Sequence, residues 1–226
     1  MKEEQIKEIL KIVKDNYEEI AVDFDLTRRK PIWPELVEIV ANTKSGSSVL
    51  DVGCGNGRLL EAFQTKQINY LGLDASKQLI ALAKKNYPGR DFIVKDILDL
   101  KSLDKKFDLV ISVAVLHHLP SFKLRLEALN EMLAVTAPQG MLIFSVWRMW
   151  NNKKYKPLLY KNIWQKITGQ TKLEIGDLLF PWKKGDSQRY YHAFTKHELN
   201  KLVRAAGYKN FELVVEAHNY WIIIKK

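Results

Sequence analysis

The stretch Ser48-Val-Leu-Asp-Val-Gly-Cys-Gly-Asn-Gly57 decides the fold. Its first five residues form a short apolar run, typical of a strand buried on both faces, and a glycine-rich turn follows at once. Glycine has no Cβ atom, so the backbone of such a turn can approach a ligand closely. We therefore predict a strand, a ligand-binding loop over 51–57 and a helix from about Arg58 to Thr65.

The rest of the chain continues this alternation of strands and helices. The predicted strands cover residues 70–74, 91–95, 107–113 and 140–147, followed by a closing pair near 211–216 and 220–224. The predicted helices cover 76–86, with Ser76 as the N-cap, 124–134, and 196–206, which Thr195 caps and Gly207 ends. This order is typical of βαβ units with right-handed crossovers, so we predict an α/β fold with a doubly wound, mostly parallel sheet.

The chain has 226 residues, enough for one large core, and we expect a single domain over 1–226. We divide it into an N-terminal helical cap (1–46), a cofactor-binding core (47–147), a basic aromatic insertion (148–194) and a final helix with a strand hairpin (195–226). From Arg148 to Arg189 the pattern shows no clear strand, so we expect a partly helical insertion after the fifth strand.

Other sequence signals limit the compartment and the metal chemistry. The N-terminus has no apolar signal core, and no stretch approaches the length of a membrane span, so we expect a cytoplasmic protein without membrane contact. The lone cysteine, Cys54, excludes an internal disulfide. No Cys/His spacing predicts a metal site, and we expect none.

The net charge of +10 lies entirely in the last third of the chain. Residues 1–146 hold 20 basic and 20 acidic side chains, whereas residues 147–226 hold 16 basic and 6 acidic ones. This asymmetry favours a localised anionic partner such as nucleic acid. The alternative is a solvated lysine-rich surface.

The spacing of the glycines indicates which ligand the loop binds. Dinucleotide sites require Gly-x-Gly-x-x-Gly, but Arg58 occupies the place of the third glycine here. Asp74 ends the second predicted strand, where a carboxylate can accept both ribose hydroxyls, and Asp96 ends the third. A single acid at a strand end is more often a cap or turn residue. Three acids, counting Asp51, at successive carboxyl ends favour a nucleoside ligand.

This pattern resembles class I S-adenosylmethionine-dependent methyltransferases, over about Ser47 to Trp147. The resemblance implies a Rossmann-like, seven-stranded sheet with its last strand antiparallel, and S-adenosyl-L-methionine as the cofactor. It implies that the glycines line the methionine part, Asp74 the ribose, and Asp96 with Ile97 the adenine. The residues implied in cofactor binding are Asp51, Gly53, Cys54, Gly55, Gly57, Asp74, Ala75, Asp96, Ile97, Ser112, Val113 and Ala114.

Three further segments resemble the family that methylates carboxymethyluridine at the tRNA wobble position. They are Tyr17 to Pro34, which contains Arg28 and Trp33; Ser112 to Leu119, which contains His117 and His118 and is followed by Arg125; and Arg189-Tyr-Tyr-His-Ala-Phe194. The resemblance implies that Arg28, His118 and Arg189 position the acceptor. The residues implied in substrate binding are Trp33, His117, Trp147, Tyr190 and His192, while Tyr191 and Phe194 are expected to be structural.

The reaction that this family performs needs few catalytic groups. A carboxylate acceptor is already anionic at neutral pH, so no general base has to remove a proton, and orientation supplies most of the rate. An arginine fork or a histidine donor can hold such a carboxylate. Each segment also has a structural alternative: Trp33-Pro34 can simply begin a helix, and one of the two histidines can be a packing or capping residue.

The resemblance gives the basic insertion a partner, tRNA. Its lysines (Lys153, Lys154, Lys156, Lys161, Lys166, Lys183 and Lys184) and aromatics (Tyr155, Tyr160, Trp164 and Trp182) are predicted to contact the anticodon stem-loop. The alternative is a lid whose aromatics form a small satellite core. Members of this family also work with a small zinc-binding activator subunit, which is a further expected partner.

Two other functions remain open from the sequence. The same core serves small-molecule methyltransferases, because the core fold alone does not identify the acceptor. A non-catalytic subunit that binds the cofactor and presents its basic face to RNA is the second alternative. Release of S-adenosylhomocysteine with tRNA as the acceptor separates these possibilities.

Overall fold

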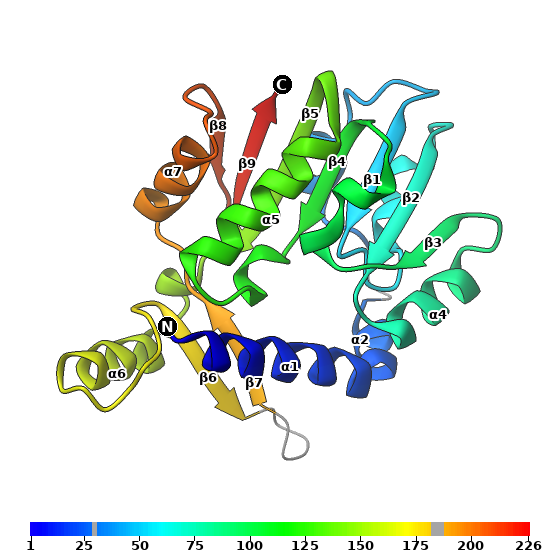
Figure 1. Cartoon of the computed structure of the whole chain (residues 1–226). Coiled ribbons are helices and arrows are strands. Elements are labelled where there is room, and N and C mark those ends of the chain that lie inside the picture. The colour runs from blue at the N-terminus through cyan, green and yellow to red at the C-terminus, as the bar shows by residue number, and fades with distance from the viewer. Residues whose placement is uncertain (29–30, 182–187) are drawn as a thin grey trace. The chain divides into compact units, whose positions relative to one another are not determined.

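The computed structural model describes residues 1–28, 31–181 and 188–226 (Figure 1). The α-helices are α1 (Glu3–Glu19), α2 (Ala21–Thr27), α3 (Pro34–Ile39), α4 (Lys77–Asn86), α5 (Phe122–Val135), α6 (Lys156–Ile167) and α7 (Lys196–Ala205). The strands are β1 (Ser48–Val52), β2 (Asn69–Asp74), β3 (Asp91–Val94), β4 (Phe107–Val113), β5 (Thr136–Trp147), β6 (Asp177–Pro181), β7 (Gln188–His192), β8 (Glu212–Val215) and β9 (Asn219–Lys225). Short 3₁₀ turns are η1 (Arg58–Phe63), η2 (Ile97–Asp99), η3 (Lys101–Leu103), η4 (Leu116–His118) and η5 (Met149–Asn151).

The main sheet has seven strands in the order β3-β2-β1-β4-β5-β9-β8. β1 pairs in parallel with β2 and β4, and β2 pairs in parallel with β3. β9 runs antiparallel to β5, because Gln139 near the start of β5 bonds Lys226 at the far end of β9, whereas Arg148 bonds His218 just before β9 begins. The predicted doubly wound sheet with an antiparallel last strand is confirmed.

The described residues divide into two compact units, which we describe separately. The loop unit comprises Tyr17–Val113, Glu131–Ile143 and Ile223–Lys226, and the aromatic unit comprises Met1–Asn16, Ala114–Asn130 and Phe144–Ile222. The expected single domain over 1–226 stays a prediction.

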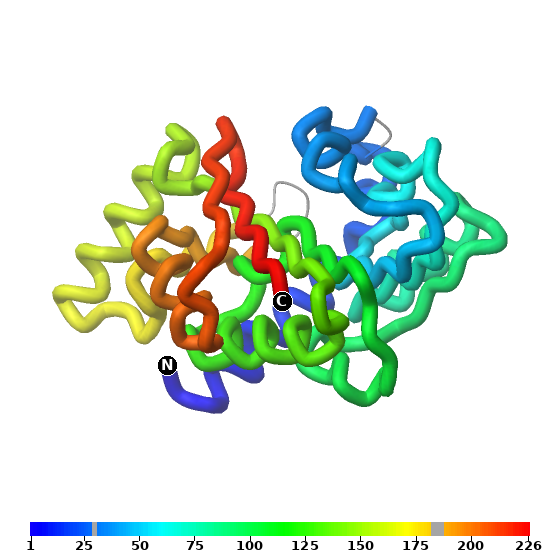
Figure 2. The backbone as a smooth tube through the Cα atoms, turned by 90° about the horizontal axis from the view of Figure 1, so that it is seen from above, coloured from blue at the N-terminus to red at the C-terminus, as the bar shows by residue number. Residues whose placement is uncertain are grey.

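The loop unit is built on fully buried parallel strands. Val49, Leu50 and Val52 of β1 are all inaccessible to solvent, as expected for a strand covered on both faces. α4 packs on β2 and β3 (Figure 1), and the Ser76 side chain accepts a hydrogen bond from the N–H of Leu79, so the predicted N-cap is confirmed. In Figure 2 the part of this unit from α3 to β2 is the continuous stretch coloured blue to cyan.

The aromatic unit contains a feature that the sequence pattern did not predict. β6 and β7 form an antiparallel two-stranded ribbon, with α6 packed on β6 (Figure 1), so the expectation of an insertion without strands was wrong. Among the described residues, β6 and β7 pair only with each other. Their inner side chains fill a small core, so burial of these side chains stabilises the ribbon. That core contains Met149, Leu159, Leu178, Tyr191 and Ala193.

Two further expectations can be compared with the structure. The helix predicted from Arg58 is a 3₁₀ turn, η1, which begins after Gly57 in the left-handed conformation. α7 begins with a complete capping box between Thr195 and Glu198, as Thr195 predicted. Along the described chain, no helix combines the length and the apolar character needed to cross a bilayer.

Candidate active site

The glycine loop, residues 51–57, adopts a backbone conformation that is unfavourable for residues with a Cβ atom. Gly53, Gly55 and Gly57 have φ of 73°, 56° and 83°, in the left-handed region. The N–H groups of Gly53 and Cys54 both donate to the Leu73 carbonyl, at 2.8 and 2.9 Å, which fastens the loop to the end of β2. A Cβ atom on Gly57 would lie 2.9 Å from ring atoms, so both conformation and space require glycine there.

The predicted acids lie at the ends of the parallel strands. The Asp51 carboxylate accepts a 2.7 Å hydrogen bond from the Tyr70 hydroxyl, and burial raises the pKa of Asp51 to about 7. Asp74 accepts the N–H of Gly55 on one oxygen and that of Ser76 on the other, at 3.0 and 2.9 Å, and burial raises its pKa as well. Both oxygens of Asp74 are thus fixed in direction.

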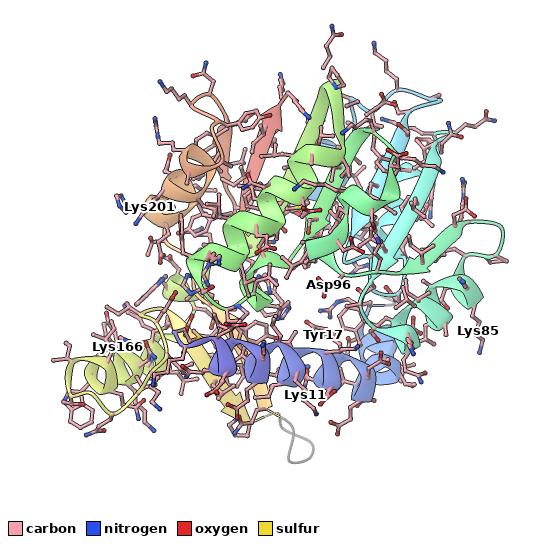
Figure 3. All side chains as sticks on the ribbon, viewed as in Figure 1. Lys11, Tyr17, Lys85, Asp96, Lys166 and Lys201 are labelled. Carbon is pink, nitrogen blue, oxygen red and sulfur yellow. The ribbon has the colours of Figure 1, made fainter. Side chains whose placement is uncertain are left out.

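The third acid follows β3 and is labelled in Figure 3. Asp96 is exposed, and one of its oxygens accepts the N–H of Leu98 at 2.9 Å. Ile97 beside it is buried, and Ala75, which follows Asp74, is exposed. The role of Asp96 and Ile97 toward an adenine stays a prediction.

The end of β4 differs from the expectation in one respect. Ser112 is fully buried, and its hydroxyl donates to the Val52 carbonyl at 3.0 Å, so this side chain joins β4 to β1 and is occupied within the sheet. Val113 is partly exposed. Ala114 has φ of 60°, a left-handed conformation that costs energy for a residue with a Cβ atom. Such strain is often found at functional sites.

The N-terminal segment supplies two predicted residues to the loop unit. The Arg28 guanidinium lies over the Phe24 ring, 4.6 Å from its centroid, and a Phe24 ring carbon lies 3.1 Å from where a Cβ atom of Gly55 would stand. Trp33 lies under the Arg58 guanidinium at 6.0 Å. The structure thus connects Arg28 to the glycine loop through Phe24, and it places Trp33 against Arg58, the residue that follows this loop. Arg29 and Lys30 lie outside the described residues.

The aromatic unit gathers the predicted histidines around one tyrosine. The His117 ring centroid lies 4.9 Å from that of Trp147 and 5.4 Å from that of Tyr191, and His118 lies 5.0 Å from Tyr191. His117 is inaccessible to solvent, and within the described part of the chain neither of its ring nitrogens has a hydrogen-bond partner. Burial holds the pKa of His117 well below its usual range, so its ring is neutral at pH 7.

His118 is neutral for a similar reason. Burial lowers its pKa to about 4, and its Nδ1 lies 3.3 Å from the carbonyl oxygen of Tyr190. A carbonyl can only accept, so Nδ1 carries the proton of the neutral ring and Nε2 is an acceptor. The predicted use of a histidine as a hydrogen-bond donor to a carboxylate therefore does not suit Nε2 of His118.

Successive side chains of β7 point to opposite faces, so the residues of the Arg189 segment lie on two sides of the strand. Arg189 donates to the Tyr191 hydroxyl at 3.1 Å on one face of the strand. On the other face, Asp177 accepts hydrogen bonds from the Tyr190 hydroxyl at 2.7 Å and from His192 Nδ1 at 2.8 Å. Tyr190 and His192 are buried, which disfavours the direct substrate contact predicted for them.

Arg125, which follows the second of the predicted segments, connects two parts of the aromatic unit. It is buried, and its guanidinium bonds the Leu119 carbonyl at 3.1 Å and the Glu174 carboxylate at 3.2 Å. It therefore joins α5 to the segment before β6.

Comparisons with known proteins agree with this geometry. A family model described as a methyltransferase domain matches residues 24–213. A tRNA (carboxymethyluridine(34)-5-O)-methyltransferase of Schizosaccharomyces pombe is 30% identical over 222 residues, covering 93% of this chain and 94% of that protein. The chain belongs to the family of these methyltransferases.

Other relatives of the methyltransferase are larger proteins or share only its fold. The mouse tRNA (carboxymethyluridine(34)-5-O)-methyltransferase ALKBH8 is 37% identical over 66% of this chain, which spans 22% of that protein. An S-adenosylmethionine-dependent methyltransferase structure from Methanosarcina mazei has a TM-score of 0.67 at 22% identity, covering 87% of this chain and 99% of that one. A complex of the Haloferax volcanii Trm112 methyltransferase activator with a methyltransferase has a TM-score of 0.58 at 20% identity, covering 90% and 78%.

Sequence reasoning missed two features of this methyltransferase: the position of Tyr191 and a contact between α2 and the glycine loop. Tyr191 was expected to be only structural, but it lies at the centre of the histidine cluster and bonds Arg189. Strand alternation would have placed Tyr191 on the face of Arg189. The contact joins α2 to the glycine loop through Asp25 and Asn56, and no sequence pattern signals this long-range contact.

Proposed function

We propose that this protein transfers a methyl group from S-adenosyl-L-methionine to the carboxylate of 5-carboxymethyluridine at the wobble position of tRNA. The full-length similarity to the S. pombe enzyme of that name supports the acceptor. This similarity over 93% of the chain is the observation that carries the proposal. The buried histidines agree with it, because burial lowers the pKa values of His117 and His118. His118, with a pKa of about 4, is too weak a base to deprotonate a hydroxyl or ammonium group efficiently at pH 7. A carboxylate requires no such base.

The residues of the loop unit fit the cofactor. Three left-handed glycines leave the backbone of the loop open to a ligand, and Asp74 has both oxygens oriented by N–H groups. On this proposal the loop holds the methionine part, Asp74 the ribose hydroxyls, and Asp96 with Ile97 the adenine. When bound, the cofactor supplies a methyl group on a positively charged sulfur.

The acceptor side requires positive charge and orientation. The carboxylate oxygen forms a bond to the methyl carbon while the carbon–sulfur bond breaks, its electron pair stays on sulfur, and a methyl ester and S-adenosylhomocysteine result. The Arg28 and Arg189 guanidinium groups can each bind an anionic oxygen through a fork of donors. The Phe24 ring supports Arg28, and the Tyr191 hydroxyl bonds Arg189, so each fork is partly oriented before substrate binds.

Helix α6 provides the surface proposed for the RNA. Tyr160, Trp164 and Ile167 are 57%, 57% and 78% exposed along one face, and from 151 to 173 the sequence has six lysines and no acid. Lys166, labelled in Figure 3, is one of them. Exposed aromatic rings can stack on unpaired bases while lysines bind phosphates.

The other aromatic residues predicted for RNA divide differently. Tyr155 packs on Phe180 and Tyr191, with ring centroids 5.8 and 6.4 Å away, so it belongs to the satellite core that the alternative interpretation expected. Trp182, Lys183 and Lys184 lie outside the described residues.

A small zinc-binding activator subunit is a further proposed partner. The likeness of the fold to the methyltransferase in the H. volcanii Trm112 complex supports this proposal. Purification of the chain alone and after co-expression with such a subunit, followed by comparison of melting temperature and turnover, tests it. We propose that this activity takes place in the cytoplasm.

The test of the proposed function uses purified protein, S-adenosyl-L-methionine and two anticodon stem-loop RNAs. One RNA carries 5-carboxymethyluridine at position 34, and its control carries uridine. We expect S-adenosylhomocysteine release and a methyl ester only with the first RNA. Equal turnover with both RNAs, or turnover with small carboxylic acids alone, would contradict the proposal and favour the small-molecule alternative.

A further inference from the structure

Asp25 of α2 joins three elements through one oxygen atom. This Oδ1 accepts a hydrogen bond from Asn56 Nδ2 at 2.9 Å and another from Asn86 Nδ2 at 2.7 Å. Asn56 lies between Gly55 and Gly57 in the glycine loop, and Asn86 is the last residue of α4. A residue of the N-terminal segment is therefore bonded both to the loop and to the helix that follows β2.

Burial makes the bond to Asn56 consequential. Asp25 and Asn56 are each only 6% exposed, so neither group regains full hydration if the other is removed. A buried donor left without an acceptor costs more than an average hydrogen bond contributes. The glycines on both sides of Asn56 are flexible, so an anchored Asn56 side chain restricts a segment that would otherwise sample many conformations.

The same turn of α2 contacts the loop a second time. The Phe24 ring lies against Gly55, and the Arg28 guanidinium lies over that ring at 4.6 Å. The N–H of Arg28 also donates to the Asp25 carbonyl at 3.0 Å. Phe24, Asp25 and the C-cap residue Arg28 thus lie together at the end of α2. Phe24 and Asp25 contact the cofactor loop, and Arg28 is proposed to bind the methyl acceptor.

We propose that Asp25 is a positioning residue that holds the cofactor loop in its binding conformation through Asn56 and links that loop to Arg28. An ordered loop loses less conformational freedom when the cofactor binds, which raises affinity. Linkage is reciprocal, so an acceptor held by Arg28 strengthens cofactor binding by the same factor as the cofactor strengthens acceptor binding. The role of Arg28 rests on the proposed function, whereas the role of Asp25 toward the loop requires only cofactor binding.

The first test measures S-adenosylhomocysteine affinity by calorimetry without RNA. Asp25→Ala removes both bonds while alanine preserves the helix, and Asp25→Asn retains an Oδ1 that accepts both. Asn86→Ala is the matched control, since it breaks one bond to the same oxygen without touching the loop. We expect affinity to fall about ten-fold in Asp25→Ala and less than about three-fold in the other two variants. Unchanged affinity in Asp25→Ala, or an equal loss in Asn86→Ala, would overturn the proposal.

A second readout follows the loop in the cofactor-free protein. Hydrogen exchange at the amides of Asn56 and Gly57 should be faster in Asp25→Ala than in Asn86→Ala, after correction for global stability. Equal exchange in the two variants would show that the loop does not depend on Asp25.

The link to Arg28 is tested with the modified stem-loop RNA in the presence and absence of saturating S-adenosylhomocysteine. Wild-type protein should bind this RNA more tightly with S-adenosylhomocysteine, and Asp25→Ala should lose most of that difference. Equal RNA affinity in both conditions would overturn the link. If the wild-type protein does not bind the RNA at all, the proposed acceptor and the link fail together, while the RNA-free measurements still decide the role of Asp25.

Discussion

Two glycines with the same φ angle allow the packing behind the cofactor loop to be measured. Gly57 and Gly89 both have φ of 83°, so alanine at either position adopts a left-handed φ at a similar energetic cost. A Cβ atom on Gly89 would meet nothing within 4 Å. A Cβ atom on Gly57 would lie 2.9 Å from ring atoms of Phe92 and Tyr87. The difference between the two alanine variants therefore isolates the steric term.

The magnitude follows from these contacts. The left-handed conformation costs about 1–2 kcal/mol for a residue with a Cβ atom, which is the whole expected loss for Gly89→Ala. Carbon atoms prefer separations of about 3.5–4.0 Å, so the Gly57→Ala contacts force a shift of Phe92, which is buried in the core. Overpacking of this kind adds about 1–3 kcal/mol. We expect Gly57→Ala to lose about 2–5 kcal/mol of unfolding free energy.

Urea unfolding of the wild type and both variants measures this difference. Equal slopes of unfolding free energy against urea concentration would show that the unfolded states are comparable. Calorimetry with S-adenosylhomocysteine gives a second readout, in which Gly57→Ala should weaken binding and Gly89→Ala should not. Equal destabilisation by the two substitutions would refute the reasoning, because it would mean that Phe92 and Tyr87 yield freely.

Three further predictions concern charge and orientation. The pKa of Asp51 is raised to about 7 in the folded state, so the unfolding free energy of the wild type should fall as pH rises from 4 to 7, by at most about 4 kcal/mol. Asp51→Asn should flatten this pH dependence, which urea unfolding at a series of pH values measures. Burial raises the pKa of Glu198, but the His192 ring 3.4 Å away and the hydrogen bonds of the capping box outweigh this effect and lower the pKa to about 2. The stability that Glu198 contributes is therefore present above pH 4.5 and lost toward pH 2. Glu198→Gln should lower the melting temperature at pH 7, and the two proteins should have the same melting temperature in acid. Tyr191→Phe removes the hydroxyl that Arg189 bonds, and steady-state kinetics with the modified stem-loop should show kcat/KM about ten-fold lower with unchanged cofactor affinity.

The sheet was predictable because its signals are local. β4 begins and ends at the predicted residues, 107 and 113, since a buried parallel strand is a continuous apolar run with polar flanks. Ser76 and Thr195 cap helices as predicted, because an N-cap depends on a residue only three positions away. The glycine loop was predictable for the same reason.

The rest of the candidate site depends on long-range contacts. The β6–β7 ribbon is stabilised by packing with Met149 and Leu159, so its residues carry no alternating pattern of their own. Asp25 meets Asn56 across 31 residues and Asn86 across 61, and polar residues in loops and helix ends are common enough that no spacing singles them out. The protonation of His118 likewise depends on a carbonyl 72 residues away.

Nucleoside mass spectrometry of the modified stem-loop RNA after incubation with the purified protein and S-adenosyl-L-methionine tests the central claim most directly. The account predicts that 5-carboxymethyluridine at position 34 gains one methyl group as an ester, which mild alkali removes to restore the carboxylate. A methyl group on a ring nitrogen or a ribose hydroxyl, or a methylated RNA that alkali leaves unchanged, would contradict it.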